Sequence, residues 1–135
     1  MSQIAPVIKA FLIADKVLQE KNTNKWCAIG IFDRIYAPQF PCIHTNLALY
    51  IRLGDAQGKY KVKIEFCDSA DRVLAKFENI EIDIPSRLAC PDFGINTTNL
   101  LIPAPGKYCF KLYFNDLIAQ LFDLDVAVFP SRKEP

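Results

Sequence analysis

The sequence predicts an all-β domain, an antiparallel two-layer β-sandwich that is immunoglobulin-like in outline. Two observations predict this fold. Apolar and polar residues alternate with a period of two along several segments, and successive side chains of a strand point to opposite faces. Clusters of Asn, Asp, Gly and Pro separate these segments, and nine prolines disfavour long helices. One-sided alternation is typical of antiparallel sheets with one dry face and one solvated face.

Two stretches near the N-terminus are considered first. Residues 7–20 fit a helical stripe as well as a strand that carries Ile8, Leu12 and Ala14 on one face. The turn-like Asn22-Thr23-Asn24 follows, and a hairpin needs a strand on each side, so we predict a strand. The next stretch, 26–36, is apolar on both faces, which predicts a central strand covered on both sides.

The clearest alternation lies further along the chain, at residues 45–53, 59–67, 80–84 and 107–115. Turn-forming residues at 55–58, 68–71, 103–106 and 115–116 connect strands. The predicted core consists of the inward-facing apolar residues: Ile29, Ile31, Leu47, Leu49, Ile51, Val62, Ile64, Phe66, Phe110, Leu112, Phe114 and Val126.

Two remaining stretches bear on function. Residues 86–99 are irregular and predict a crossing connection with one short strand. The last run, 117–129, is apolar on both faces, as is 26–36. Either the irregular stretch folds over these apolar faces, or they form a partner surface that includes Trp26, Phe32 and Tyr36.

Composition excludes several functional classes. The 135 residues predict a single domain with a polar tail at 130–135, and 16 Lys+Arg against 15 Asp+Glu give a net charge of +1. This balance predicts neither nucleic-acid nor membrane binding. No secretory leader and no membrane-spanning run is apparent, and five cysteines, an odd number, argue against a disulfide framework. We therefore expect a cytoplasmic protein.

The candidate chemistry is sparse. Cys42 and His44 share a strand face, so a thiolate–imidazolium pair is conceivable, but no orienting group is evident. Asp33-Arg34 could bind a ligand or form a structural ion pair, and Asp123 with Asp125 could bind a cation or mark a solvated edge.

The other patterns do not indicate a functional site. The basic row Lys59, Lys61 and Lys63 has its neighbouring aromatic residues on the opposite face, which favours a solvated face. No metal-ligand spacing and no Gly-rich phosphate loop occurs, so we predict no metal, no cofactor and no catalytic residue.

Several residues together resemble a family of short bacterial proteins of unknown function. They are Ala14-Asp15, Lys25-Trp26, Gly-Ile-Phe-Asp-Arg-Ile at 30–35, Phe40-Pro41, Leu-Ala-Leu-Tyr-Ile-Arg-Leu at 47–53 and Gly-Lys-Tyr-Cys-Phe at 106–110. The resemblance extends over residues 10–128. The last motif also looks like the late hairpin of many immunoglobulin-like sandwiches. The resemblance implies a β-sandwich and brings no activity, cofactor or catalytic residue with it.

Three functions remain. The first is a non-catalytic binding or assembly module, which either binds a protein partner or self-associates, because catalytic constellations are missing while two strands are apolar on both faces. The second is a sandwich that binds a small ligand or carbohydrate through exposed Trp26, Tyr36 or Tyr50. The third is a thiol-dependent enzyme that uses Cys42 and His44.

Overall fold

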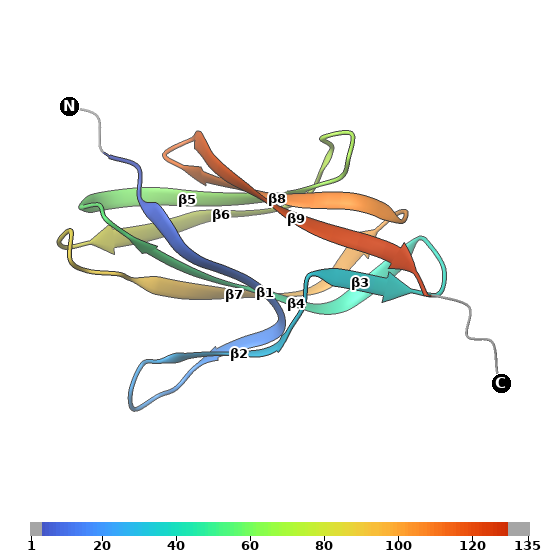
Figure 1. The fold of residues 1–135 in the computed structure, drawn as a ribbon, viewed down its shortest axis with the longest axis horizontal. Coiled ribbons are helices and arrows are strands. Elements are labelled where there is room, and N and C mark those ends of the chain that lie inside the picture. The colour runs from blue at the N-terminus through green and yellow to red at the C-terminus, as the bar shows by residue number, and fades with distance from the viewer. Residues whose placement is uncertain (1–3, 130–135) are drawn as a thin grey trace.

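The structure is a computed structural model that describes residues 4–129. Within this range the chain forms nine strands and no helix (Figure 1), which confirms the all-β prediction. The strands are β1 (Val7–Gln19), β2 (Trp26–Ile31), β3 (Arg34–Ala37), β4 (Cys42–Gly54), β5 (Gly58–Cys67), β6 (Val73–Ile84), β7 (Asp92–Ile102), β8 (Gly106–Phe114) and β9 (Leu117–Val128). The tail predicted at 130–135 lies outside the described residues.

The strands form two sheets stacked as two layers (Figure 1). One has four strands in the order β2-β1-β4-β7, and the other has five in the order β3-β9-β8-β5-β6. The pair β3–β9 is parallel, so the larger sheet is mixed and the purely antiparallel prediction is wrong at this pair. A parallel pair cannot be closed by a tight hairpin, and these two strands are far apart in the sequence. The immunoglobulin-like outline stays a prediction.

The hydrophobic core lies between the two sheets. Its largest cluster joins residues of β4 and β1 to residues of β5, β8 and β9. Phe66 stacks on Tyr108 with ring centroids 5.3 Å apart and is tilted against Phe110 at 5.0 Å. Ten of the twelve predicted core residues are buried: Leu47, Leu49, Ile51, Val62, Ile64, Phe66, Phe110, Leu112, Phe114 and Val126. Alternation therefore identified the inward face of these strands correctly.

The turn residues adopt the conformations that their types favour. Asn115 and Asp116 both have positive φ (51° and 67°) and connect β8 to β9 in a two-residue hairpin. Asp55 and Asp71 also have positive φ, and each lies in a predicted turn. Residues 7–20 form a strand as predicted, and β1 pairs with both β2 and β4.

The prediction of one central strand over 26–36 is wrong. This stretch forms β2 at the edge of the smaller sheet and β3 at the edge of the larger one, because the chain crosses between the layers at Phe32 and Asp33. Gly30, with φ of 71°, immediately precedes the crossing. Ile29 and Ile31 are predicted to be core residues, but they are 52% and 59% exposed. Only the opposite face of β2, with Trp26 and Ala28, packs against the sheet.

Residues 86–99 were expected to be largely irregular with one short strand. Instead, Asp92 begins the eleven-residue strand β7, which pairs along its length with β4. This strand is an edge, and its alternation ends at Thr97-Thr98-Asn99, where polar residues occupy both faces and Asn99 has positive φ. The run 117–129 forms β9, whose residues Leu117, Ile118 and Leu121 are exposed.

Candidate binding surface

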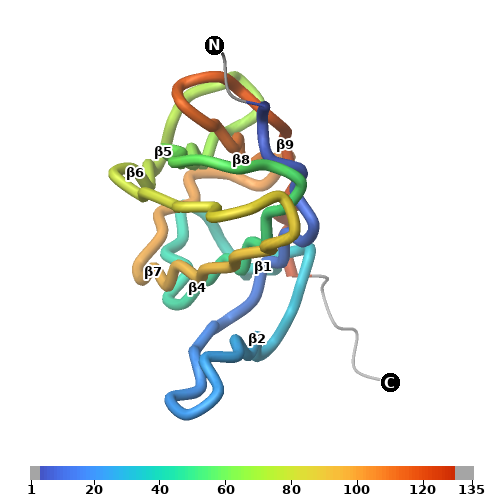
Figure 2. Tube along the Cα trace, turned by 90° about the vertical axis from the view of Figure 1, so that its left-hand side faces the viewer, coloured from blue at the N-terminus to red at the C-terminus, as the bar shows by residue number. Residues whose placement is uncertain are grey.

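The far half of the β1–β2 hairpin turns over the outer face of β4 and β7 (Figure 2). Asn96 of β7 fixes it there: its side-chain amide donates to the Val17 carbonyl oxygen at 2.9 Å and accepts from the Val17 N–H at 3.0 Å. The amide thereby pairs with the backbone of β1 as a neighbouring strand would. The hairpin is held against the sheet by hydrogen bonds as well as by packing.

Trp26 packs into the space beneath this hairpin. It contacts a small buried cluster of Ala14, Val17 and Ala48, separate from the main core. A Cβ atom built on Gly94 of β7 would lie 2.6 Å from the Trp26 ring and 2.6 Å from a Val17 methyl. Gly94 therefore provides the space that the indole occupies, and this ring is directed at the chain's own sheet.

The other two predicted partner residues lie in different surroundings. Phe32 is partly buried against the main core, with its ring centroid 5.7 Å from that of His44. Tyr36 is exposed, lies 6.0 Å from the Phe129 ring and accepts a hydrogen bond of 3.4 Å from Arg34. Phe32 and Tyr36 both line a shallow groove of about 330 Å³ at the crossing between the sheets. The three residues thus do not form one packed patch.

A different set of residues forms the exposed apolar face of the hairpin. Side chains of Cys27, Ile29 and Ile31 alternate with those of Trp26 and Ala28, so they point to the side away from the four-stranded sheet. All three are exposed. Sequence reasoning identified this strand but reversed its faces, because both faces are equally apolar and the pattern does not show which one is covered.

The β2 edge also differs from most of the other sheet edges. Edge strands of soluble proteins usually carry charges or are very short, which prevents them from pairing with another chain. β6 carries several charges, β7 is lined by Asn and Thr, and β3 has four residues and includes Arg34. β2 contains no charged residue. The Leu117–Phe122 part of β9, which β3 does not cover, is also uncharged, so β2 is one of two uncharged edges among the described residues 4–129.

Cys42 and His44 lie on β4 as expected, but their environment opposes an ion pair. Burial raises the pKa of the Cys42 thiol. Burial also lowers the pKa of His44, against smaller opposing effects from Asp15 and the Asn46 backbone. Nε2 of His44 is buried and has no hydrogen-bond partner among residues 4–129. A thiolate–imidazolium pair needs the opposite shifts, so this arrangement favours two neutral side chains.

The lowered pKa of His44 predicts how stability depends on pH. The unfolded state has the higher pKa, about 6.5, and so binds the proton first as the pH falls. We expect the free energy of unfolding to decrease as the pH falls through this value. His44→Phe should weaken the dependence, because His44 is the only histidine. Urea denaturation of the wild type and of His44→Phe from pH 7.5 to 5.5 measures the free energy of unfolding at each pH. If this free energy changed equally with pH in both proteins, the prediction would be contradicted.

Two of the charged candidates, Arg34 and Asp125, form one ion pair on the surface. Arg34 of β3 lies 3.3 Å from Asp125 of β9, and both side chains are about half exposed. The sequence left two alternatives for Arg34, a ligand-binding residue or a structural ion pair, and the contact with Asp125 is the structural ion pair. No group of three or more His, Cys, Asp or Glu side chains that could hold a metal ion occurs within the described part of the chain.

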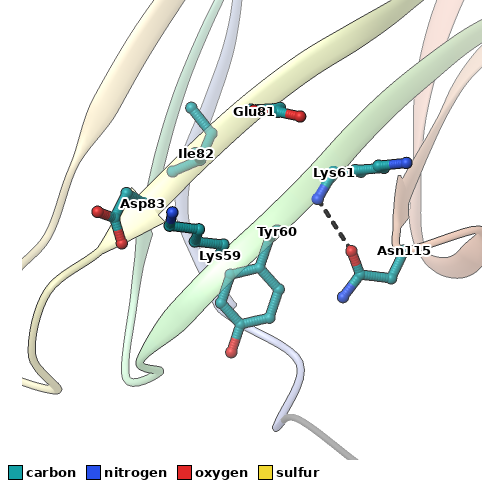
Figure 3. A pocket seen from close by; sticks show the side chains of 7 residues that line it. All are labelled: Lys59, Tyr60, Lys61, Glu81, Ile82, Asp83 and Asn115. Carbon is teal, nitrogen blue, oxygen red and sulfur yellow. Dashed lines mark hydrogen bonds between the residues drawn. The ribbon is translucent and has the colours of Figure 1, made fainter.

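The basic row on β5 faces acidic residues on β6. In the antiparallel register Lys59 is opposite Asp83 and Lys61 is opposite Glu81. These four side chains line an open groove of about 440 Å³, with the Lys61 N–H donating to the side chain of Asn115 at 2.9 Å (Figure 3). Opposite charges that face each other across strands offset the local field. The row therefore does not form an unbroken basic surface.

Comparison with known proteins identifies the family. A family model described as a family of unknown function, DUF6941, matches residues 9–127. The chain belongs to this family. The predicted resemblance to an uncharacterised family is thereby confirmed, while the bacterial origin stays a prediction.

This DUF6941 chain was also compared with curated proteins and with solved structures. No curated protein matches it. Among solved structures it is similar to the alkylpurine DNA glycosylase AlkC of Pseudomonas fluorescens, bound to DNA containing an abasic site analogue, with a TM-score of 0.51 and 10% identity. The match covers 70% of this chain and 28% of the glycosylase chain. At this identity the similarity concerns the fold alone. Between residues 4 and 129 no helix is long and apolar enough to cross a membrane.

Proposed function

We propose that this chain is a non-catalytic binding module that engages a protein partner through strand β2. The observation that carries the proposal is an uncharged edge strand with Ile29 and Ile31 more than half exposed. An extended segment of a partner can add to such an edge by main-chain hydrogen bonds. Its alternate side chains would then pack beside Cys27, Ile29 and Ile31.

The hairpin supports this role because it is already ordered. Trp26 and Asn96 fix it to the four-stranded sheet, so a partner meets a formed strand. A preorganised surface avoids part of the entropy cost of ordering a loop on binding. We also propose a cytoplasmic location, which the five free cysteines support.

The alternative functions have weaker support. Tyr50, one candidate for contact with a small ligand, already donates its hydroxyl to Asp92 at 2.5 Å, and Trp26 is directed at the sheet. A thiol-dependent enzyme would need an activated Cys42, whose pKa burial raises instead. Nucleic-acid binding is not proposed, since acidic residues face Lys59 and Lys61.

Ile29→Lys tests the proposal by placing a charge on the β2 surface. The matched control is Ile43→Lys, because Ile43 is 60% exposed but lies on β4, where it pairs with Leu101 of β7 and not with β2. Both variants should melt close to the wild type. In pull-downs from extracts of the cells that express the chain, Ile29→Lys should lose a partner that wild type and Ile43→Lys retain.

Binding of that purified partner should then slow amide hydrogen exchange in residues 26–31 of the wild-type chain. Equal partner profiles for the two variants, and a purified chain that also fails to associate with itself through β2, would overturn the proposal. Protection that is confined to another strand would also overturn it.

A further inference from the structure

We infer that Cys67 and Cys109 form a site of reversible oxidation, at which a cross-strand disulfide closes between β5 and β8. The two cysteines lie directly opposite each other in the antiparallel register of these neighbouring strands (Figure 1). Side chains of directly opposed residues point to the same face of a sheet. The adjacent pair, Phe66 with Phe110, points into the core, so the two thiols lie together on the outer face of the five-stranded sheet. This site is separate from β2, which belongs to the other sheet.

The backbone spacing of the two cysteines suits a disulfide. Opposed residues of an antiparallel pair have Cα atoms about 4.5 or 5.5 Å apart, depending on whether they exchange hydrogen bonds. Disulfides span Cα distances of about 4.4–6.8 Å, most often about 5.5–6 Å. By contrast, Cys27 is opposite Leu18 and Cys42 is opposite Ile102, so neither of these cysteines faces another one.

The pair is of the wider, hydrogen-bonded kind. The Asn115 N–H donates to the Lys61 carbonyl oxygen at 2.9 Å, and these two residues continue the same strand register. Hydrogen-bonded and non-hydrogen-bonded pairs alternate along the strands, so Cys67 with Cys109, an even number of positions away, is of the same kind. The Cβ atoms of such a pair are about 5.5 Å apart and must approach by about 1 Å to form a disulfide. A disulfide that needs this adjustment is readily reduced, which makes the oxidation reversible.

Lys111 lies beside both thiols. It follows Cys109 by two positions on β8, so it is on the same face, and its ammonium group lies 3.1 Å from the carboxylate of Asp71 in the loop after Cys67. Burial raises the pKa of both thiols, and the charge of Lys111 opposes this effect at each of them. Lys111 therefore favours the thiolate, which is the form that attacks a disulfide.

Exposure sets the order of the two chemical steps. Cys109 is partly exposed and Cys67 is buried, so Cys109 reacts first. The oxidant is a low-molecular-weight disulfide: the Cys109 thiolate attacks one of its sulfur atoms and releases the other as a thiolate. The Cys67 thiolate then attacks the Cys109 sulfur, which forms the Sγ–Sγ bond and releases the second small thiolate. The oxidant thereby gains the two electrons and the two protons that the protein thiols lose.

Peptide mapping of the reduced, purified chain tests the inference after incubation in dilute solution with oxidised glutathione. Free thiols are blocked with iodoacetamide, and trypsin is then added without reductant. Trypsin cleaves after Lys and Arg, so it releases residues 64–72 with Cys67 and residues 108–111 with Cys109. We expect these two peptides to be linked, with a mass two hydrogen atoms below their sum, and dithiothreitol should separate them. If both peptides carry only the iodoacetamide label, the inference is overturned.

Two single variants test the order of reaction. In Cys67→Ser the second step is blocked, so Cys109 should accumulate as a mixed disulfide with glutathione, about 10-fold above wild type. In Cys109→Ser the buried Cys67 should remain a free thiol. Exposed Cys90 is the internal control, because it should take up glutathione equally in all three proteins.

Equal amounts of the Cys109 mixed disulfide in wild type and in Cys67→Ser would overturn the inference, as would glutathione on Cys67 in Cys109→Ser. Thermal melts establish whether each variant is folded. The mapping of the wild-type chain decides the inference without either variant.

Discussion

Leu49→Asp is expected to unfold the domain. Leu49 lies in the middle of β4 between β1 and β7, is 1% exposed and belongs to the main core cluster. Leucine truncation in a core costs about 2–5 kcal/mol even without a charge. An unpaired buried carboxylate adds a desolvation cost of several kcal/mol. The sum is comparable to the entire stability of a small domain, about 5–15 kcal/mol.

Circular dichroism at increasing temperature measures the effect. Wild type should show a cooperative transition, and Leu49→Asp should lack one at 25 °C and above. The matched control is Leu88→Asp, because Leu88 is 95% exposed and a charge there stays in water. If Leu49→Asp melted at the wild-type temperature, the inward face assigned to β4 would be wrong.

Leu49 was correctly predicted to be buried, and Ile29 was wrongly predicted to be buried, for the same physical reason. A strand with one polar face and one apolar face shows which side is buried, and β5 and β8 have such faces. β2 is apolar on both sides, so its sequence is compatible with a central strand and with an edge strand. The structure makes it an edge, because the chain leaves for the other sheet after Ile31.

The candidate site could be predicted only in part for the same reason. The sequence singled out Trp26, Phe32 and Tyr36 as one surface, since they share the parity of a single strand. The crossing at Phe32 places Trp26 and Tyr36 in different sheets. The length of β7 was underestimated because polar residues at 97–99 interrupt its alternation. The contact of its outer face with the hairpin at Gly94 and Asn96 is long-range, and a sequence pattern does not contain such a contact.

Gly94→Val is expected to displace the hairpin from the outer face of the sheet. The backbone of Gly94 does not have the positive φ of Gly30, so the effect arises from space and not from backbone strain. Its new Cβ would lie 2.6 Å from both the Trp26 ring and the Val17 methyl, which must move. Overpacking of this kind costs about 1–3 kcal/mol.

Trp26 is the only tryptophan, so its fluorescence reports the displacement directly. Emission of Gly94→Val should shift to the red in native buffer, and urea denaturation should give a lower midpoint than wild type. Thr98→Val is the control, because Thr98 is an exposed residue of the same strand. Unchanged emission together with an unchanged midpoint would mean that the indole does not occupy the space above Gly94.

The same substitution connects the buried face of the hairpin to its exposed face. Gly94 is separated from Ile29 and Ile31 by the hairpin itself, so it cannot contact a partner bound at the β2 edge. If the partner needs a formed and fixed strand, Gly94→Val should weaken its binding, and Thr98→Val should not.

A double variant Gly94→Val/Trp26→Leu should recover part of the stability that Gly94→Val loses, because leucine is smaller than tryptophan and returns the space that valine takes. Residues in direct contact show such non-additive free energies. Additive losses of stability would instead place the two side chains in independent environments.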